Sequence, residues 1–380
     1  MQSLGSIRRS FAPWTDPAAK PYIVFDGVTK RFGDFTAVNN LSLSIYEREF
    51  FALLGASGCG KSTLLRMLAG FETPTEGRIL IDGVDMAGVA PYERPVNMMF
   101  QSYALFPHMS VEQNIAFGLK QEGMPKPQIE ERVKEMLELV KLTQFAKRKP
   151  HQLSGGQRQR VALARSLADG PKVLLLDEPL GALDKKLREE TQFELMDLQQ
   201  NLGLTFVVVT HDQEEAMTMA DRIAILDKGE VMQVATPSEV YEAPNSRFVA
   251  GFVGNVNMFE GKVAERTPQA ARITGGTGAE IVVENAGDAA AGNTVAFAIR
   301  PEKIKVSSRQ PAAGTPNVLE GEVFDIAYLG DMTVYHVKLG DGQVVRASSL
   351  NSARVMEDPL TWNDKAWISF APDAGVVLTR

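Results

Sequence analysis

The chain has 380 residues, of which 44% are hydrophobic and 23% are charged, and its formal net charge is −7. This length predicts two domains with a sizeable core, the composition excludes a disordered chain, and no apolar run approaches the roughly 18 residues of a membrane-spanning helix. The negative charge disfavours a broad surface for nucleic acid, and the single cysteine, Cys59, leaves no disulfide framework and favours a reducing compartment.

Residues 1–20 predict a flexible tail. The segment Arg-Arg-Ser-Phe at 8–11 is superficially similar to a twin-arginine export signal, but Pro-Trp-Thr-Asp-Pro at 13–17 follows in place of an apolar segment. We therefore expect the protein to remain in the cytoplasm.

Two strand-like apolar runs follow, at 22–28 and 41–45, with Gly33 and Asp34 marking a turn between them. Phe32 lies in that turn region. Its ring could stack on adenine or pack in the core, and its spacing alone favours neither.

The stretch from 50 to 65 carries the most specific motif. Residues 50–54 predict a buried strand, residues 55–62 match G-x-x-x-x-G-K-S, and the leucines from position 64 on have helical spacing. Such glycines let successive backbone N–H groups cradle a phosphate at the positive end of a helix dipole, while Lys61 can reach the β- and γ-phosphates and Ser62 can bind Mg²⁺. A chance surface loop is the alternative, which the flanking strand and helix disfavour. The expected nucleotide contacts of this loop are Gly55, Ala56, Ser57, Gly58, Cys59, Gly60, Lys61, Ser62 and Thr63.

A turn-rich section at 73–77 precedes a short predicted strand and turn at 78–83. The next apolar run, at 98–100, is closed by Gln101. This polar side chain is therefore expected where a strand ends and a loop begins.

From Ser110 the pattern becomes helical. Ser110-Val111-Glu112-Gln113 is a capping box, and a second helix carries apolar residues at 129, 133, 136, 137 and 140. Two amphipathic helices between strands indicate a helical subdomain at about 103–160.

Leu-Ser-Gly-Gly-Gln at 153–157 opens the next predicted helix, which ends at Gly170-Pro171. A serine and two glycines at a helix start make a second candidate site for an anion. An ordinary N-cap is the alternative, and it would be preferred if this motif stood alone.

The apolar run at 173–176 predicts a strand covered on both faces of a parallel sheet, and it ends in Asp177-Glu178. Carboxylates at such a strand end lie where α/β sheets bind ligands. Asp177 is expected to hold Mg²⁺, directly or through water, and Glu178 to polarise a water for attack on the γ-phosphate. A solvated acidic turn is the weaker alternative.

Gly-Ala-Leu-Asp at 181–184 leads into a long predicted helix that Gly203 caps. A third buried strand, at 206–210, is followed directly by His211. A single histidine is more often structural than catalytic, but its place at the end of a core strand predicts that it reaches the same phosphate.

A strand at 222–226 and a helical segment at 237–252 close this part of the chain. Beyond about 255, short alternating runs such as 294–299 and 333–337 predict small barrels or a sandwich. The Gly- and Ala-rich stretch at 274–292 is expected to be loop, and His336 to be structural.

Taken in order, these motifs resemble the ATP-binding subunit of ABC transporters over residues 20–250. The resemblance rests on the phosphate loop, a glutamine at a strand end, Leu-Ser-Gly-Gly-Gln at 153–157, Leu-Leu-Leu-Asp-Glu-Pro at 174–179 and Thr-His-Asp at 210–212. The β-rich tail resembles the regulatory domain of the importer subfamily that serves maltose, polyamines, sulfate and ferric iron, and Arg300-Pro301-Glu302 is similar to a recurring motif of that domain.

The resemblance implies an α/β fold: an ABC-type P-loop NTPase domain at 21–250 with an inserted helical subdomain. An all-β domain of oligonucleotide/oligosaccharide-binding-type barrels would follow at 251–380. It also implies ATP and Mg²⁺ as cofactors.

Carried over residue by residue, the resemblance makes Phe32 the adenine-stacking aromatic, and Ser62, Gln101 and Asp177 the residues near Mg²⁺. Gln101 would sense the γ-phosphate and signal to membrane subunits. Glu178 would be the catalytic base and His211 the γ-phosphate switch.

The same resemblance implies a homodimer. Ser154, Gly155, Gly156 and Gln157 would touch the ATP held by a second copy, and Asp184 would cross the same interface. ATP binding would then close the dimer and hydrolysis would open it.

The expected partners are two transmembrane permease subunits and, indirectly, a periplasmic solute-binding protein, with the chain peripheral on the cytoplasmic face of the inner membrane and no nucleic acid bound. Stretches at 51–60, 97–108, 146–151 and 326–331 resemble polyamine importers, with putrescine as the expected cargo. Another cargo, such as spermidine, a sugar, sulfate or ferric iron, stays open, as does an ABC-type ATPase acting on nucleic acid.

Overall fold

The computed structural model describes residues 11–181, 183–267, 269–275, 280–353 and 359–379. The chain forms two compact units, Met1–Ser238 and Glu239–Arg380. Half of the expected tail, 1–10, lies outside the described residues. The other half contains the 3-10 helix η1 (Pro13–Thr15), and Trp14 stacks on the Arg222 guanidinium at 4.7 Å.

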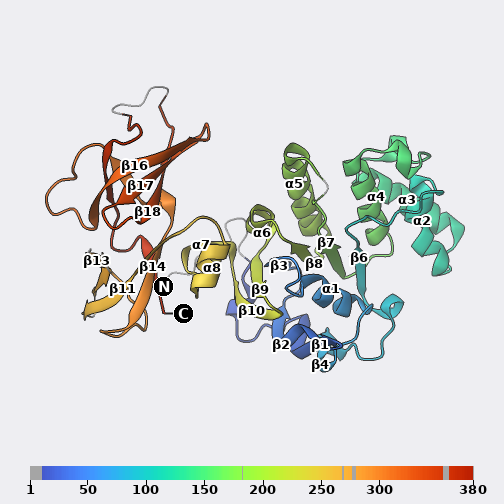
Figure 1. The fold of residues 1–380 in the computed structure, drawn as a ribbon. Helices are drawn as coiled ribbons and strands as arrows, with labels where there is room; N and C mark the ends of the chain where they lie inside the picture. The colour runs from blue at the N-terminus through green and yellow to red at the C-terminus, as the bar shows by residue number, and fades with distance from the viewer. Residues whose placement is uncertain (1–10, 182, 268, 276–279, 354–358, 380) are drawn as a thin grey trace. The chain divides into compact units, whose positions relative to one another are not determined.

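A six-stranded sheet is the larger of the two sheets described in the first unit (Figure 1). Its strands are β3 (Phe50–Gly55), β6 (Val96–Met99), β7 (Val173–Asp177), β8 (Thr205–Thr210), β9 (Arg222–Asp227) and β10 (Glu230–Ala235). Their order is β10-β9-β3-β8-β7-β6, and all neighbours run parallel except β10, which is antiparallel to β9. Strands β3, β7 and β8 are buried along their whole length, and therefore their sequences are continuous apolar runs.

A smaller antiparallel sheet has the order β2-β1-β4-β5. Its strands are β1 (Ile23–Phe32), β2 (Phe35–Ile45), β4 (Glu76–Ile81) and β5 (Val84–Asp85). Phe32 pairs with Phe35, so it ends β1 and does not lie in the turn as the sequence suggested. Helices α1 (Lys61–Ala69), α5 (Lys185–Leu202) and α6 (Gln213–Met219) follow β3, β7 and β8.

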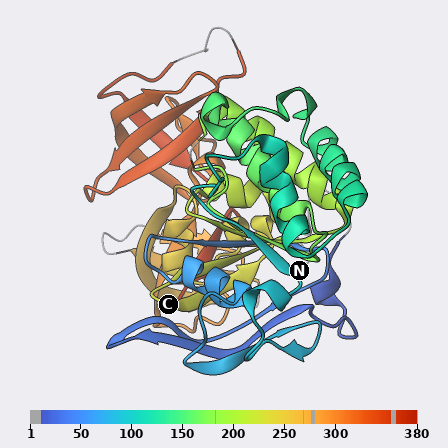
Figure 2. The same ribbon diagram turned by 90° about the vertical axis from the view of Figure 1, so that its right-hand side faces the viewer.

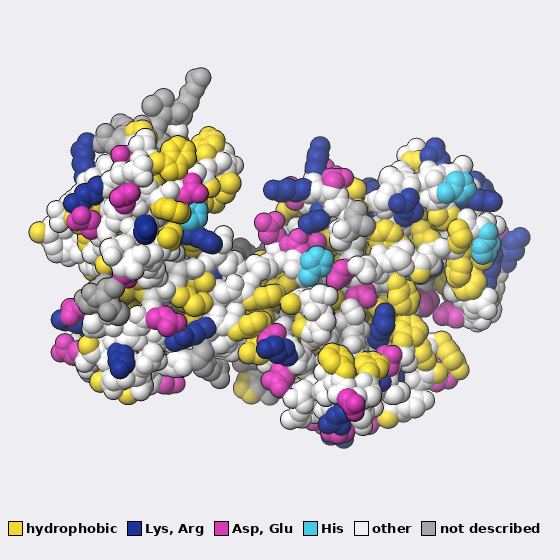
Figure 3. All heavy atoms as spheres, in the orientation of Figure 1, with side chains coloured by type: hydrophobic (Ala, Val, Ile, Leu, Met, Phe, Trp, Pro, Cys, Tyr) yellow, Lys and Arg dark blue, Asp and Glu magenta, His cyan; other side chains and the backbone are white. Residues whose placement is uncertain are grey.

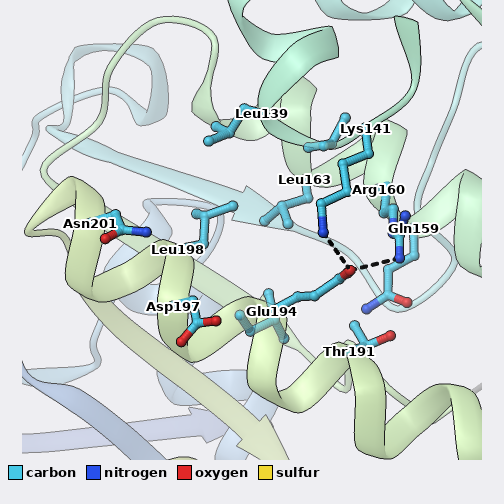
Figure 4. Close-up of a pocket in the computed structure, with 12 residues that line it drawn as sticks. Leu139, Lys141, Gln159, Arg160, Leu163, Thr191, Glu194, Asp197, Leu198 and Asn201 are labelled. Atoms are coloured by element: carbon cyan, nitrogen blue, oxygen red, sulfur yellow. Dashed lines mark hydrogen bonds and ion pairs between the residues drawn. The ribbon is translucent and has the colours of Figure 1, made fainter. Parts of the chain in front are cut away.

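Helices α2 (Val111–Gln121), α3 (Lys126–Leu139) and α4 (Gly155–Leu167) stand together in both ribbon views (Figures 1 and 2). The capping box predicted at Ser110 is present, with Ser110 and Gln113 bonded to each other's backbone N–H. Glu194 of α5 contacts Arg160 at 2.9 Å and Lys141 at 3.7 Å, beside a cavity of about 250 Å³ (Figure 4). This cluster joins α4 and the segment after α3 to α5.

The second unit starts with α7 (Pro237–Glu242), which begins just before the boundary, and α8 (Arg247–Phe252), and it continues as two antiparallel sheets. One has the order β13-β12-β11-β14-β20, with bounds Glu280–Val283, Ala271–Gly275, Asn257–Arg266, Thr294–Ile299 and Gly375–Leu378. The other has the order β15-β19-β16-β17-β18, with bounds Lys305–Ser307, Lys365–Ser369, Val318–Tyr328, Met332–Leu339 and Val344–Leu350. The all-β prediction is confirmed.

Two details of this unit were not foreseen. The stretch expected to be loop contains β13, which pairs with β12 because Ile281 and Val283 alternate into the core. Hydrophobic side chains also remain visible on the surface of the unit (Figure 3), and its large exposed ones are Phe324, Tyr328, Leu329, Val344, Leu350 and Trp362.

Arg300, in the motif Arg300-Pro301-Glu302, is a buried anchor of the second unit. Its guanidinium donates hydrogen bonds to the carbonyl oxygens of Tyr241, Ala250 and Asn255. Tyr241 in turn donates to Glu302 at 2.8 Å, and burial together with this carboxylate raises the pKa of Tyr241 to about 12. These bonds tie α7 and α8 to the strands. The predicted domain boundary at residue 250 stays a prediction.

Candidate functional site

The sheet order brings four polar segments to one edge. The phosphate loop follows β3, Gln101 follows β6, Asp177 ends β7 and Thr210 ends β8. Because β3, β8, β7 and β6 are parallel neighbours, their carboxyl ends lie side by side. The site therefore lies at the carboxyl ends of these four strands.

The phosphate loop ends at Gly60, which is the N-cap of α1. Its φ is +102°, a left-handed conformation, and a Cβ placed there would lie 2.5 Å from the Ala37 carbonyl oxygen. No side chain in the described part of the chain caps this helix start. The first backbone N–H groups of α1 are thus left for a ligand, as an anion site requires.

Lys61 is buried, and its ammonium donates to the carbonyl oxygens of Gly55 at 2.7 Å and Ala56 at 2.9 Å. Within the described residues no carboxylate forms an ion pair with it. A buried cation whose acceptors are neutral carbonyls favours an anionic ligand. This observation fits a nucleotide phosphate at the loop.

Ser62 and Asp177 form the oxygen-rich part of the site. The Ser62 hydroxyl donates to Oδ1 of Asp177 at 3.1 Å. Burial raises the pKa of the Asp177 carboxyl, and the Ser62 hydrogen bond opposes that shift. Among the described residues no group of three or more His, Cys, Asp or Glu side chains could hold a metal ion. Hard oxygens of this kind nevertheless fit Mg²⁺, which usually completes its shell with phosphate oxygens and water.

Glu178 connects Gln101 and His211. Gln101 Nε2 donates to Oε2 of Glu178 at 2.8 Å, and His211 Nδ1 lies 3.3 Å from Oε1. The backbone of Glu178 has φ +47°, a conformation that costs a non-glycine residue about 1–3 kcal/mol and that clusters at functional sites. The structure thus brings together the three residues that the sequence predicted as catalytic.

The remaining predicted residues lie elsewhere. Ser154 caps α4 through a complete capping box with Gln157, and it is exposed; Gly156 behind it is buried against Leu187. No hydrogen bond or ion pair found in the described ranges joins these residues to the phosphate loop. Asp184 is exposed and caps α5 by accepting from the N–H of Leu187. Phe32 is also exposed, with the Lys30 ammonium 4.7 Å from its ring centre.

The sequence reasoning missed a charged cluster behind His211. Arg188 of α5 forms ion pairs with Asp212 at 2.9 Å and Glu215 at 3.7 Å, and Glu215 accepts a hydrogen bond from Thr210. Asp212 and Glu215 have the spacing of an N-cap and the third residue of the helix that it caps. This part of the cluster could therefore have been predicted from the sequence. Nothing in the sequence linked them to Arg188.

Among the described residues, every helix is too short or too polar to span a membrane.

Residues 38–181 match the family model described as ABC transporter, and residues 297–378 match the one described as TOBE domain. The putrescine transport ATP-binding protein PotG of Escherichia coli K12 is 55% identical over 96% of this chain and 97% of its own.

The chain belongs to the ABC transporter family.

Other relatives agree. The spermidine/putrescine import ATP-binding protein PotA of Rubrobacter xylanophilus is 56% identical over 83% of both chains. Among solved structures, a bacterial ABC transporter cassette in a dimeric structure is 36% identical with a TM-score of 0.52, covering 57% of this chain and 98% of its own. A dimeric post-hydrolysis state bound to ADP and Pi is 35% identical with a TM-score of 0.51, covering 57% and 98% of the two chains. The predicted family and fold class are confirmed.

Proposed function

We propose that this ABC transporter protein is the ATP-hydrolysing subunit of a polyamine importer, with putrescine as cargo. The single observation that carries the ATPase part is Glu178, held by Gln101 and His211 beside the phosphate loop. The cargo is inferred from the similarity to PotG, a putrescine transport protein, and PotA, a spermidine/putrescine import protein.

In this proposal the phosphate loop binds ATP through its backbone N–H groups, and Lys61 moves from its own loop carbonyls to the β- and γ-phosphates. Ser62 and Asp177 would hold Mg²⁺, with Gln101 close by, and the ion would neutralise charge on the phosphates. Phe32 would stack on adenine, and its exposed ring leaves a face free for this role.

Glu178 would accept a proton from the attacking water, because its carboxylate lies one residue beyond Asp177 and is already oriented by two neighbours. His211 would donate to the γ-phosphate. Gln101 would report the presence of that phosphate, since it bonds the catalytic carboxylate and also leads into the helical subdomain.

A homodimer completes the site in this proposal. The start of α4, with Ser154, Gly155, Gly156 and Gln157, would face the ATP bound to the other copy. Asp184 would lie at the same seam. Support comes from two facts: Ser154 at the α4 start is exposed, and the two solved structures described above, both of one cassette, are dimeric.

The helical subdomain offers a surface for the permease subunits. A groove of about 530 Å³ runs between α2 and α3, with an apolar floor that includes Ala116, Ile129, Val133 and Leu137 and lysines at its edges. We propose that a cytoplasmic helix of the permease docks in this groove, because an amphipathic helix fits an apolar groove with a charged rim. The chain would then lie on the cytoplasmic face of the inner membrane and would be indirectly in contact with a periplasmic solute-binding protein.

The cargo is tested by transport. The chain, assembled with its permease subunits in vesicles and supplied with ATP, should take up radiolabelled putrescine delivered by the solute-binding protein, and should not take up maltose. The Glu178→Gln complex is the matched control and should transport neither. Uptake of maltose but not of putrescine would overturn the cargo, while leaving the ATPase assignment in place.

A further inference from the structure

Arg188 lies in the first turn of α5, four residues after Asp184. Its Nη1 donates to Oδ2 of Asp212 at 2.9 Å, and its Nη2 donates to the carbonyl oxygen of Leu183 at 3.2 Å. One guanidinium therefore contacts the segment before α5 and the residue that follows His211. Figure 1 shows the two helices concerned, α5 and α6.

A second carboxylate faces the same guanidinium. Glu215 of α6 has a side chain only 3% exposed, and its Oε1 lies 3.7 Å from Arg188 Nε. Its Oε2 accepts from the Thr210 hydroxyl at 2.7 Å. Burial raises the pKa of Glu215, while the Thr210 hydrogen bond and the charges of Arg188 and His211 favour the ionised form and the charge of Asp212 opposes it. Thr210 directly precedes His211 and Asp212 directly follows it, so the cluster includes both chain neighbours of His211.

Asp212 has two separate tasks on its two oxygens. Oδ1 accepts from the N–H groups of Glu214 at 2.8 Å and Glu215 at 3.2 Å, which caps α6. Oδ2 binds Arg188, and the Asp212 N–H donates to the Thr210 hydroxyl at 3.0 Å. The backbone of His211 is therefore held between two residues that both belong to the Arg188 cluster.

We propose that Arg188 is a positioning residue for His211, coupling the Leu183–Asp184 segment to the His211 loop; this rests on the proposed function, in which that segment meets the second copy. A guanidinium is suited to the role because its rigid fork donates in two directions at once. Closure of the dimer against Asp184 would then be transmitted through Arg188 to the imidazole that faces the γ-phosphate.

The present geometry leaves room for such a movement. Arg188 Nε is buried without a hydrogen-bond acceptor in the part of the chain that the structure describes. Glu215 at 3.7 Å is the carboxylate that faces it. An approach of roughly 1 Å would form a charge-assisted hydrogen bond of ordinary length.

The test compares ATP hydrolysis by full-length Arg188→Gln and Asp212→Asn variants with the wild type. Asn at position 212 keeps the cap on α6, because Asn is as good an N-cap as Asp, but it removes the charged partner of Arg188. Both variants should lose about tenfold to a hundredfold in kcat through misplacement of His211. The KM for ATP should change by less than about threefold, because no bond of Arg188 reaches the phosphate loop.

Three further variants separate positioning from structure. Arg188→Lys should have a higher kcat than Arg188→Gln, since an ammonium can keep the contact with Asp212. It should stay below the wild type, because the ammonium cannot also keep the contact with the Leu183 carbonyl oxygen. Lys186→Gln, an exposed cation of the same helix, should behave as wild type. The double variant Arg188→Gln/Asp212→Asn should be no slower than the slower single variant, because paired residues are not additive.

Wild-type kcat in both single variants, or a double variant slower by the product of the two losses, would overturn the coupling. If Arg188→Gln does not fold, Asp212→Asn decides alone. A wild-type chain without ATPase activity would refute the proposed function instead, so the two failures are distinguishable.

Discussion

The starts of α1 and α4 are built in opposite ways. At α1 the cap is Gly60, no side chain bonds the first N–H groups, and a buried lysine stands beside them. At α4 the cap is Ser154, which bonds the N–H of Gln157 while Gln157 bonds the N–H of Ser154. Among the described residues, no side chain bonds the donors at the α1 start, whereas the α4 start bonds two of its own, the N–H groups of Ser154 and Gln157.

The difference indicates which start needs a ligand in the single chain. Unsatisfied donors beside a buried cation fit a phosphate from the same chain's nucleotide. A start that bonds two of its own donors needs a ligand less, so a role for the exposed Ser154 depends on a phosphate brought by another copy. The following predictions test that contrast.

Replacement of Glu178 should have the largest effect. Glu178→Gln removes the proton acceptor but keeps the side-chain shape, so we expect kcat to fall by about a thousandfold with ATP binding intact. In Mg-ATP the variant should accumulate as a dimer, in which both helix starts contact phosphate. Turnover and light scattering after size exclusion measure the two effects. Exposed Glu190→Gln is the control, and near-normal hydrolysis by Glu178→Gln would refute the assigned base.

Replacement of Lys61 should affect the α1 start alone. Lys61→Ala removes a charge-assisted contact to phosphate, so the Kd for ATP should rise about tenfold to a hundredfold. Isothermal titration of the full chain measures this. Exposed Lys172→Ala should bind as the wild type does. Full affinity in Lys61→Ala would mean that the loop binds no phosphate through this residue.

Replacement of Ser154 should have the smallest effect, and the chain holds its own control. Ser110 and Ser154 each accept from the N–H three residues on, both at 3.3 Å. Ser154→Ala and Ser110→Ala should each cost about 1 kcal/mol of stability, measured by thermal unfolding. Only Ser154→Ala should lower kcat, by about tenfold, with ATP affinity of the single chain unchanged. Equal kcat in the two variants would remove Ser154 from the interface.

Much of this architecture could be predicted from local patterns. Continuous apolar runs predicted β3, β7 and β8 because strands buried on both faces need no polar alternation. The Ser110 capping box was also predicted, since it depends on residues only three apart, whereas the capping box at Ser154 was not predicted and only an ordinary N-cap was considered there. By contrast, Phe32 was placed in a turn and β13 in a loop, because strand ends and short strands are fixed by their pairing partners and their own sequence says little.

The kinds of groups at the site could be predicted from local sequence: a glycine-rich loop with Lys61, carboxylates after one buried strand and a histidine after another. Which of these groups contact one another depends on the tertiary fold. Glu178 reaches Gln101 across 77 residues, and Ser62 reaches Asp177 across 115. Such contacts depend on the order of parallel strands, which no local pattern encodes, and the same reason hid Arg188 until α5 and α6 were seen together.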